Sequence, residues 1–184
     1  MSHPLDQFIF CPKCGSSHFK IHNEKSKKCH DCGFIYYFNS SASTVGIIIN
    51  SREELLVARR AKEPAKGTFD LPGGFVDLNE TGEEAIMREI KEETQLIVSR
   101  TFYQFSIPNT YEYSNFLVHT LDLFYYCEVE DYHTLKAQDD VESLRFIPIN
   151  KLNVEDFGLL SIQQGIKILK DRALRKEGLD HRHL

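Results

Sequence analysis

The pattern of apolar and polar positions along the chain predicts an α+β fold. Runs rich in β-branched and aromatic residues predict strands over residues 44–50, 55–60, 116–129 and 144–149. A helix is predicted over residues 81–94. A second helix is predicted near the end of the chain, where apolar residues recur at spacings of 3, 4, 3 and 4: Leu159, Ile162, Ile166, Leu169 and Ala173. This order of strands, helix, strands and helix favours a mixed sheet between helices over a doubly wound fold.

The helix predicted over residues 81–94 carries an acidic stripe. Each residue advances by about 100° around a helix, which places Glu89, Glu92 and Glu93 on about one-third of the circumference. These carboxylates repel one another, and the helix dipole disfavours the last two by roughly 0.3–1 kcal/mol each. Mg2+ or Mn2+ relieves both penalties because these ions prefer hard oxygen ligands. The spacing therefore favours a metal site over a solvated acidic face, with Arg88 positioned to orient the carboxylates.

The same helix has a predicted buried face beside the acidic stripe. Ile86, Met87 and Ile90 occupy the neighbouring arc of the helix, and we expect all three to face the core. The acidic residues would then lie along the margin of the buried face, where a cleft can form.

Four of the five cysteines lie in the first 32 residues and form two C-x2-C pairs: Cys11, Cys14, Cys29 and Cys32. Thiolates two residues apart on a tight turn supply one edge of the tetrahedron that Zn2+ prefers. Gly15 and Gly33 follow the pairs and permit the backbone angles of such turns. Four thiolates close the coordination, so we expect a structural zinc. Disulfides and a nucleic-acid role of Lys25, Lys27 and Lys28 are the weaker alternatives.

Charge divides the chain in the same place as the cysteines do. Residues 1–40 hold five lysines and three acids, and the whole chain has a net charge of −5, so the remainder is strongly acidic. We therefore expect a zinc-binding unit over residues 1–40 and a second domain over residues 41–184. No apolar run approaches the roughly 18 residues of a membrane span, and the N-terminus lacks an export signal. These features favour a cytoplasmic protein without a membrane partner.

The segment Gly74–Leu96 resembles the Nudix box, G-x5-E-x7-R-E-U-x-E-E-x-G-U, where U is a bulky aliphatic residue. The matching positions are Gly74, Glu80, Arg88, Glu89, Ile90, Glu92, Glu93 and Leu96. Gln95 stands where the family has glycine, and we expect this departure to affect how the helix ends. The resemblance implies a mixed sheet sandwiched between helices, and hydrolysis of a nucleoside diphosphate linked to another moiety.

The resemblance also assigns roles to individual residues. Glu89, Glu92, Glu93 and the Gly74 carbonyl would bind Mg2+ or Mn2+, and Glu80 and Arg88 would support them. Such ions neutralise the pyrophosphate and lower the pKa of a bound water, whose proton a carboxylate must accept. A box glutamate is one candidate for this base, and the later loop offers Asp139, Asp140 and Glu142. Asp140 fits best because similar enzymes carry an acid just before this strand.

A four-cysteine ribbon followed by a Nudix domain is similar to the NADH pyrophosphatase branch of the family. That branch carries the array S-Q-P-W-P-F-P after the box, whereas this chain has FSIPNTY over residues 105–111 and no tryptophan. NADH is therefore not favoured over ADP-ribose-like or other dinucleotide substrates. The candidate substrate contacts are Gly73, Gly74 and Phe75 in the loop that enters the box, and Tyr111, whose ring can stack on a base.

The leading hypothesis is a metal-dependent pyrophosphohydrolase of a small nucleotide derivative. The alternative is a non-catalytic Nudix sensor, or a nucleic-acid-binding regulator that uses the zinc ribbon. The complete glutamate set argues against a sensor, and the absence of a strongly basic face argues against nucleic acid as a partner. The apolar C-terminal helix and the ribbon-bearing relatives make a homodimer a candidate assembly.

Overall fold

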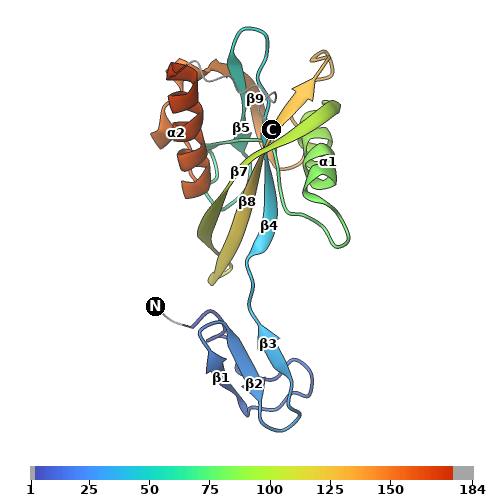
Figure 1. The fold of residues 1–184 in the computed structure, drawn as a ribbon, viewed down its shortest axis with the longest axis vertical. Helices are drawn as coiled ribbons and strands as arrows, with labels where there is room; N and C mark the ends of the chain where they lie inside the picture. Colours follow the sequence, from blue (N-terminus) through green and yellow to red (C-terminus); the bar gives the residue numbers. More distant parts are fainter. Residues whose placement is uncertain (1–2, 176–184) are drawn as a thin grey trace. The chain divides into compact units, whose positions relative to one another are not determined.

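The computed structural model describes residues 3–175 and divides into two compact units between Ser40 and Ser41. Residues 176–184, the end of the second predicted domain, lie outside the described residues. Figure 1 shows the elements of each unit. Neither helix in the described part of the chain has both the length and the apolar character needed to cross a membrane.

The first unit is a small antiparallel sheet with two cysteine turns. Its strands, in the order β1-β2-β3, are Phe19–Asn23, Ser26–Cys29 and Ile35–Tyr37. The chain between the two cysteine turns forms a hairpin of β1 and β2, and a third strand extends it. The core cluster of this unit contains Cys11, Phe19 and Cys29, with Phe34 packed against them, and Leu5 is also buried. Such a small core needs a further source of stability.

The second unit contains two three-stranded sheets and two α-helices. One sheet has the order β4-β8-β7 and the other β6-β5-β9. Their strands are β4 (Ser41–Ile47), β5 (Glu54–Arg60), β6 (Phe69–Asp70), β7 (Val98–Tyr113), β8 (Phe116–Val129) and β9 (Val141–Pro148). The helices are α1 (Gly82–Thr94) and α2 (Leu160–Leu174), with two short 3-10 helices, η1 (Ile149–Lys151) and η2 (Val154–Asp156), before α2.

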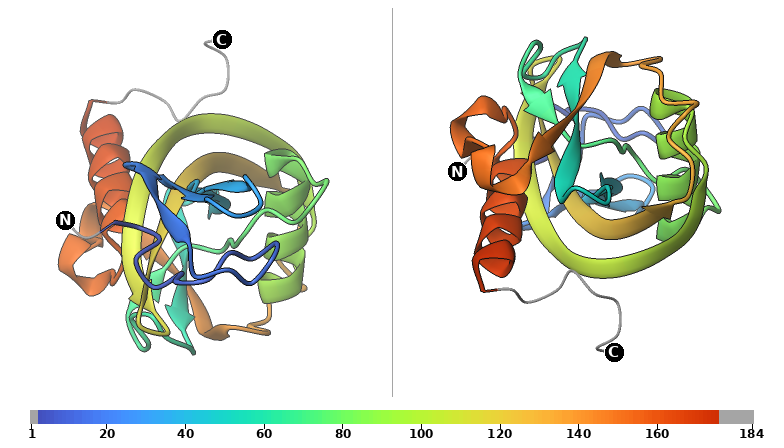
Figure 2. Two further views of the ribbon diagram at one scale, coloured as in Figure 1. Left: turned by 90° about the horizontal axis from the view of Figure 1, so that it is seen from below. Right: turned by 90° about the horizontal axis from the view of Figure 1, so that it is seen from above.

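The β4-β8-β7 sheet is mixed and lies between the two helices. β4 pairs with β8 in parallel, and β7 pairs with β8 in antiparallel. The views from below and from above in Figure 2 place α1 and α2 on opposite sides of the strands, and β7 curves around the other strands. The expected α+β class, with a mixed sheet between helices, is confirmed.

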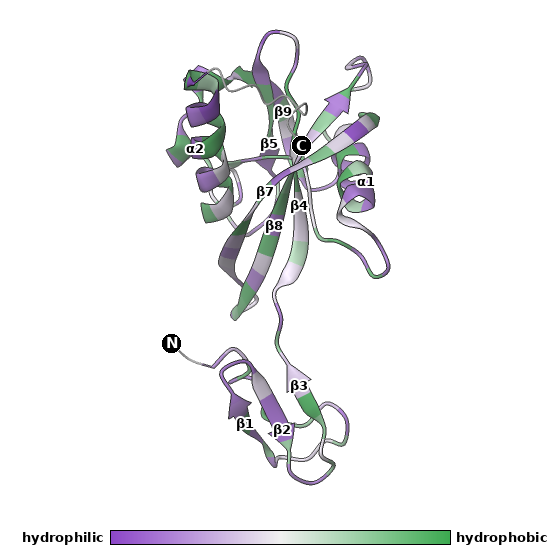
Figure 3. Ribbon diagram, in the orientation of Figure 1, coloured by the Kyte–Doolittle hydropathy of each residue, from purple (hydrophilic) through white to green (hydrophobic). Residues whose placement is uncertain are grey.

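Two apolar clusters hold the second unit together. One joins the two sheets to α2 through Val45, Ile47, Leu55, Val57, Phe124 and Ile166. The other packs α1 on β5, β8 and the residue that follows β4, through Ile48, Leu56, Ile86, Ile90 and Tyr125. Figure 3 shows the apolar residues along β8 and the two-sided character of α2 that these clusters require. Burial of Ile86 and Ile90 confirms two of the three positions expected on the inner face of α1.

Three details differ from the sequence expectations. Met87 is 41% exposed, so its predicted core position is wrong: the apolar cluster under α1 takes in Ile86 and Ile90 but not Met87. The strand predicted at residues 44–50 is shifted to Ser41–Ile47, because the residues before Thr44 pair with β8. The long strand β7 was not expected, because polar residues interrupt its apolar positions and Pro108 lies within it. β7 pairs only with β8 and is therefore an edge strand, where proline is tolerated.

Candidate functional site

The four cysteines of the first unit converge on one point. All four sulfur atoms lie within 4.8 Å of one another, with 3.8 Å between Cys11 and Cys32 and 3.6 Å between Cys14 and Cys29. A tetrahedral zinc with Zn–S bonds of about 2.3 Å requires sulfur atoms roughly 3.8 Å apart. The cysteine geometry therefore fits a zinc ion.

Local backbone geometry produces this convergence. In each cysteine pair the glycine N–H donates to the carbonyl of the first cysteine, from Gly15 to Cys11 at 2.8 Å and from Gly33 to Cys29 at 3.0 Å. The two glycines have φ angles of +73° and +75°, which glycine adopts without a steric penalty. The sulfur separations are far longer than a disulfide bond of about 2.05 Å, so the structure favours a metal over the disulfide alternative.

The lysines of the first unit do not form one open basic surface. Lys27 is only 6% exposed, donates to the Phe8 carbonyl at 3.0 Å and lies over the ring of Phe19. Its role is to cover the small core, with its aliphatic stem packed and its ammonium group bonded. This removes one of the three lysines, Lys25, Lys27 and Lys28, on which the nucleic-acid alternative depended.

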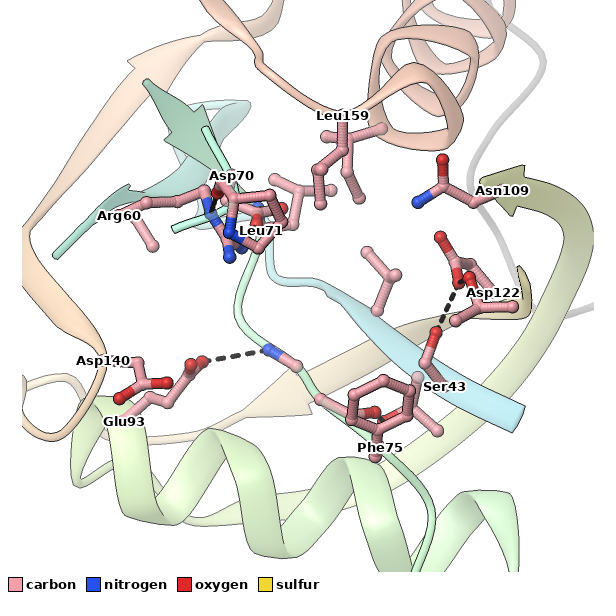
Figure 4. Close-up of a pocket in the computed structure, with 18 of the residues that line it drawn as sticks. Ser43, Arg60, Asp70, Leu71, Phe75, Glu93, Asn109, Asp122, Asp140 and Leu159 are labelled. Carbon is pink, nitrogen blue, oxygen red and sulfur yellow. Dashed lines mark hydrogen bonds and ion pairs between the residues drawn. The ribbon is translucent and has the colours of Figure 1, made fainter. Parts of the chain in front are cut away.

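A cavity of about 190 Å³ lies in the second unit, and Figure 4 shows the side chains that line it. Its walls come from β4, β5, β7, β8, the loop before α1, the end of α1, the loop before β9, and the start of α2. Four of the predicted site residues in the box and its entering loop line it, namely Gly73, Gly74, Phe75 and Glu93, and so do Tyr111 and Asp140. Residues distant in sequence therefore meet here.

Glu93 is the box carboxylate that lies in the cavity wall. It is 8% exposed, and its carboxylate accepts a hydrogen bond from the Gly73 N–H at 2.9 Å. Burial raises the pKa of Glu93 to about 8, and the nearby acids Asp70, Glu89 and Asp140 act in the same direction. A buried carboxylate surrounded by other acids is a site that a cation would stabilise.

Arg88 holds the other acids of the box. It donates to both carboxylate oxygens of Glu80, at 2.8 and 2.9 Å, to Glu89 at 2.8 Å and to Glu92 at 3.2 Å. It also donates to the Phe75 carbonyl at 3.0 Å, which ties the entering loop to the helix. Arg88 lowers the pKa of Glu80 to about 2, whereas burial raises the pKa of Glu89. The orienting contact with Glu92 is present, but Glu84, one turn before Arg88, instead bonds to Thr81 in the capping box of α1.

The loop that enters the box passes very close to Thr44 of β4 on one side and to Glu89 of α1 on the other. A Cβ at Gly73 would overlap the Thr44 carbonyl, and one at Gly74 would overlap the Glu89 carboxylate. The Gly74 carbonyl accepts from the Thr44 N–H at 2.8 Å and from its hydroxyl at 3.3 Å. Glycine at these two positions is what allows the loop backbone and the box carboxylates to share one small space. The oxygen atoms around this space are of the kind that a divalent cation prefers as ligands.

The end of α1 is formed by Gln95 in place of the family's glycine. Gln95 has φ +62° and its N–H donates to the Lys91 carbonyl. The residue thus adopts the left-handed conformation in which glycine usually ends a helix. The expected change in how the helix ends is therefore wrong: α1 stops at Thr94 as it would with glycine.

The later acidic loop brings one of its three acids to the cavity. Asp140 lines the cavity and pairs with Lys62, whereas Asp139 and Glu142 do not line it. Glu142 lies 3.8 Å from Arg59 instead. Figure 4 shows Asp140 next to Glu93 at one end of the cavity. Asp140 and Glu93 thus form a pair of acids from two distant segments.

Sequence reasoning missed four residues of the cavity with a charged or amide side chain. Arg60 and Asp70 form an ion pair between β5 and β6, and burial raises the pKa of Asp70 against the opposing effect of Arg60. Asn109 and Asp122 lie on β7 and β8 and are 5% and 4% exposed. An isolated polar residue inside an apolar strand run, such as Asp122 in LDLFYY, was the available signal, because buried polar groups need a reason.

Comparison with known proteins places residues 40–163 in one family. These residues match the family model described as NUDIX domain. A protein of Methanocaldococcus jannaschii named ADP-ribose pyrophosphatase is 35% identical over 161 residues, which cover 86% of this chain and 89% of that protein.

Two further matches extend the comparison. The NAD-capped RNA hydrolase NudC of Vibrio cholerae is 28% identical over 106 residues, 58% of this chain, and this chain matches only 39% of the length of that relative. A crystal structure of a NUDIX hydrolase from Nitrosomonas europaea superimposes with a TM-score of 0.69 at 20% identity, covering 90% of this chain and 92% of that chain. This structural match shows a shared fold.

Proposed function

The chain belongs to the Nudix family, and from that premise we propose that it is a metal-dependent pyrophosphohydrolase of a nucleoside diphosphate linked to another moiety. ADP-ribose-like compounds and dinucleotides are the foremost substrates. The observation that carries the proposal is the meeting of Glu93, the Gly73–Gly74 loop and Asp140 at one cavity, beside a helix whose Glu89 and Glu92 are bonded to Arg88. We further propose that residues 1–40 are a zinc ribbon and residues 41–184 the hydrolase domain.

The substrate class rests on chemistry and on the relatives together. The relative that shares most of its length with this chain is named an ADP-ribose pyrophosphatase, and the NudC relative is named for NAD-capped RNA. Both names describe an adenosine diphosphate joined to a second group through phosphate. A cavity of about 190 Å³ is smaller than the roughly 300–1,000 Å³ of sites that enclose a whole ligand, so it would enclose one moiety of such a molecule.

Each box residue has a distinct proposed task. Glu89, Glu92, Glu93 and the Gly74 carbonyl would hold Mg2+ or Mn2+, and Glu80 would fix Arg88 so that Arg88 fixes Glu89 and Glu92. The bound ions would neutralise the phosphates and lower the pKa of an attacking water. The Gly73 N–H would keep the Glu93 carboxylate directed at the cavity. Asp140 would accept the proton of the water, because it is the acid of its loop that reaches the cavity.

The remaining assignments follow from the same set of residues. Phe75 is 47% exposed at the cavity and Tyr111 lines it, so both rings are placed to contact substrate. The four thiolates of the ribbon would hold a structural zinc, which requires the reducing conditions of a cytoplasm. A homodimer is proposed as the assembly, and size-exclusion chromatography with light scattering tests it.

The proposal is tested by incubating the zinc-loaded protein with Mg2+ or Mn2+ and a substrate panel. The panel contains ADP-ribose, NADH, FAD, nucleoside triphosphates and capped RNA, and phosphate-containing products are resolved by chromatography. We expect turnover of ADP-ribose, and a loss of about a hundredfold or more in kcat for Glu92→Gln and Glu93→Gln. The matched control is Glu83→Gln on the same helix, where the amide oxygen can still accept a hydrogen bond from the Tyr125 hydroxyl.

Two outcomes would overturn the proposal. Hydrolysis of no panel member, together with tight binding of ADP-ribose, would support the alternative of a non-catalytic sensor. Hydrolysis that is equally fast in wild type, Glu92→Gln and Glu93→Gln would show that the box does not carry out the reaction.

A further inference from the structure

The end of the cavity away from Glu93 holds a buried amide with an unused donor. Asn109 is 5% exposed and lines the cavity from β7. Its Oδ1 accepts the Thr110 N–H at 3.0 Å, and no described residue accepts a hydrogen bond from its Nδ2. Figure 4 shows the amide nitrogen directed toward the cavity. A buried amide donor without a partner costs free energy, so its retention calls for a ligand that accepts from it.

The orientation of this amide is fixed by its own backbone neighbour. Turning the Asn109 amide over would place Nδ2 against the Thr110 N–H, and two donors would then face each other. The Asn109 side chain therefore presents a hydrogen-bond donor to the cavity, and a ligand bound there must present an acceptor.

Asp122 supplies the complementary acceptor at the same end. It is 4% exposed and accepts three hydroxyl hydrogen bonds: from Ser43 and Thr120 to Oδ1, and from Ser161 to Oδ2. No cation pairs with it in the described part of the chain. A carboxylate has about four acceptor positions, so about one remains, on Oδ2. This end of the cavity therefore presents one donor beside one acceptor.

The aliphatic side chains of the cavity indicate which kind of ligand group would carry this acceptor and this donor. Val45, Leu71, Leu159 and Ile162 line the same cavity. Aliphatic walls suit the flat faces of a nucleobase and suit poorly a ribose, which carries hydroxyls on several sides. The group is therefore a flat ring whose edge carries an acceptor next to a donor.

We propose that Asn109 and Asp122 bind the adenine base of the substrate, and so set its base specificity. Adenine carries an amino donor flanked by ring-nitrogen acceptors, which matches one acceptor and one donor. Guanine carries a carbonyl acceptor where adenine has its amino donor, and a ring N–H where adenine has an acceptor, so in the same orientation it would face Asp122 with an acceptor and Asn109 with a donor. This inference rests on the proposed function, because it assigns the base of the substrate that the box would hydrolyse.

The test compares ADP-ribose with its inosine analogue, in which a carbonyl acceptor replaces the amino donor. We expect wild type to prefer ADP-ribose by about tenfold or more in kcat/KM, since the carbonyl would face the Asp122 carboxylate. Asn109→Asp keeps the shape and the bond to Thr110 but replaces the donor with an acceptor. It should lower the preference for ADP-ribose by about tenfold or more. Asn109→Leu, which adds no charge, should lower it as well.

Asn115→Asp is the matched control, because it adds the same charge in the turn of the same β7–β8 hairpin without lining the cavity. It should leave the ratio unchanged. Equilibrium binding of the two nucleotides, measured by calorimetry, provides a readout that does not depend on turnover. A cytosine analogue is included because its edge also carries an amino donor beside a ring-nitrogen acceptor.

The outcomes separate this inference from the proposed function. Preferential binding of ADP-ribose that depends on Asn109, without hydrolysis, would support the base site and contradict the proposed reaction. Hydrolysis of both nucleotides with equal kcat/KM, or a wild-type ratio retained in both Asn109 variants, would overturn the base site and leave the reaction standing. A cytosine analogue bound more tightly than ADP-ribose would also overturn the assignment of adenine.

Discussion

The cysteine ribbon and the acidic cleft both gather side chains that we propose as metal ligands, but they hold them in different ways. In the ribbon all four sulfur atoms already lie within 4.8 Å of one another. In the cleft, protein donors hold the acids: Arg88 bonds to Glu80, Glu89 and Glu92, and the Gly73 N–H bonds to Glu93. The ribbon is closed around its ion position, whereas the cleft is open to a cavity.

This difference matches the two tasks proposed for the metals. The ribbon has a small core cluster of Cys11, Phe19 and Cys29, so its proposed zinc would stabilise the fold, and the four ligands form a complete shell. The cleft must admit substrate and ions and release product, so its carboxylates need partners that keep them in place between turnovers. Loss of the metal should therefore unfold the ribbon but only destabilise the cleft locally.

The largest expected effect is the loss of the ribbon in Cys29→Ser. Structural zinc contributes on the order of 10–16 kcal/mol of apparent binding free energy in small zinc units, and a three-cysteine site forfeits much of it. We expect less than one zinc per chain by elemental analysis and rapid proteolysis within residues 1–40. The second unit should keep its own thermal transition.

Cys127→Ser provides the matched control for this variant. Cys127 is buried in β8, with its pKa raised to about 12 by burial, and it lies outside the cysteine cluster. Its substitution should leave the zinc content at one per chain. Full zinc content in Cys29→Ser would show that the ribbon does not depend on four thiolates.

The next largest effect concerns Glu93 and pH. Its pKa is about 8 in the folded protein against an ordinary 4.5, so folding favours the protonated carboxyl. The stability that Glu93 contributes is complete below about pH 4.5 and is lost as pH rises through about 8. Without added divalent ions, Glu93→Gln should therefore be more stable than wild type at pH 8 by up to a few kcal/mol. Urea unfolding at pH 5 and pH 8 measures this.

Adding divalent ions to the same urea unfolding measurement gives a second test. Mg2+ at pH 8 should stabilise wild type and close the gap to Glu93→Gln, because the ion favours the charged carboxylate. An equal stability difference at pH 5 and pH 8 would contradict the raised pKa of Glu93.

A smaller effect is expected from Arg88→Lys. Lysine keeps the charge but cannot bond to both oxygens of Glu80 while also reaching Glu89 and Glu92. We expect hydrolysis and Mg2+ affinity to fall by about ten- to a hundredfold, with the zinc content unchanged. Arg52→Lys, in an ion pair with Glu54 on an exposed turn, is the control and should have no effect. Full activity in Arg88→Lys would show that charge alone is enough to organise the box.

The smallest effect is expected from Lys62→Ala. Lys62 pairs with Asp140, and both side chains are at least half exposed, at 64% and 51%. Exposed ion pairs contribute about 0–1 kcal/mol, so thermal unfolding should shift only slightly. A loss of several kcal/mol would mean that Asp140 is held as firmly as Glu80, which is bonded to Arg88 through both oxygens.

The elements with a clear period were predictable, and those without one were not. β8 has the predicted bounds of Phe116–Val129, and both helices agree within one residue at each end. β7 has no regular alternation, because register shifts against β8 interrupt its pattern and much of it lies at a sheet edge. The prediction that Met87 is buried failed because helical periodicity only places a residue on an arc of the helix. The neighbouring strands decide how wide the covered arc is.

The sequence alone determined the parts of the molecule that depend on local spacing. Two C-x2-C pairs, each followed by glycine, place four thiols through short-range backbone geometry, and the box spacing identifies the family. The tertiary structure decided everything that depends on burial: the high pKa of Glu93, the Arg60–Asp70 pair, and the meeting of Asn109 with Asp122. The physical reason is that desolvation and unused hydrogen bonds depend on what lies across the cavity, and no local spacing records that.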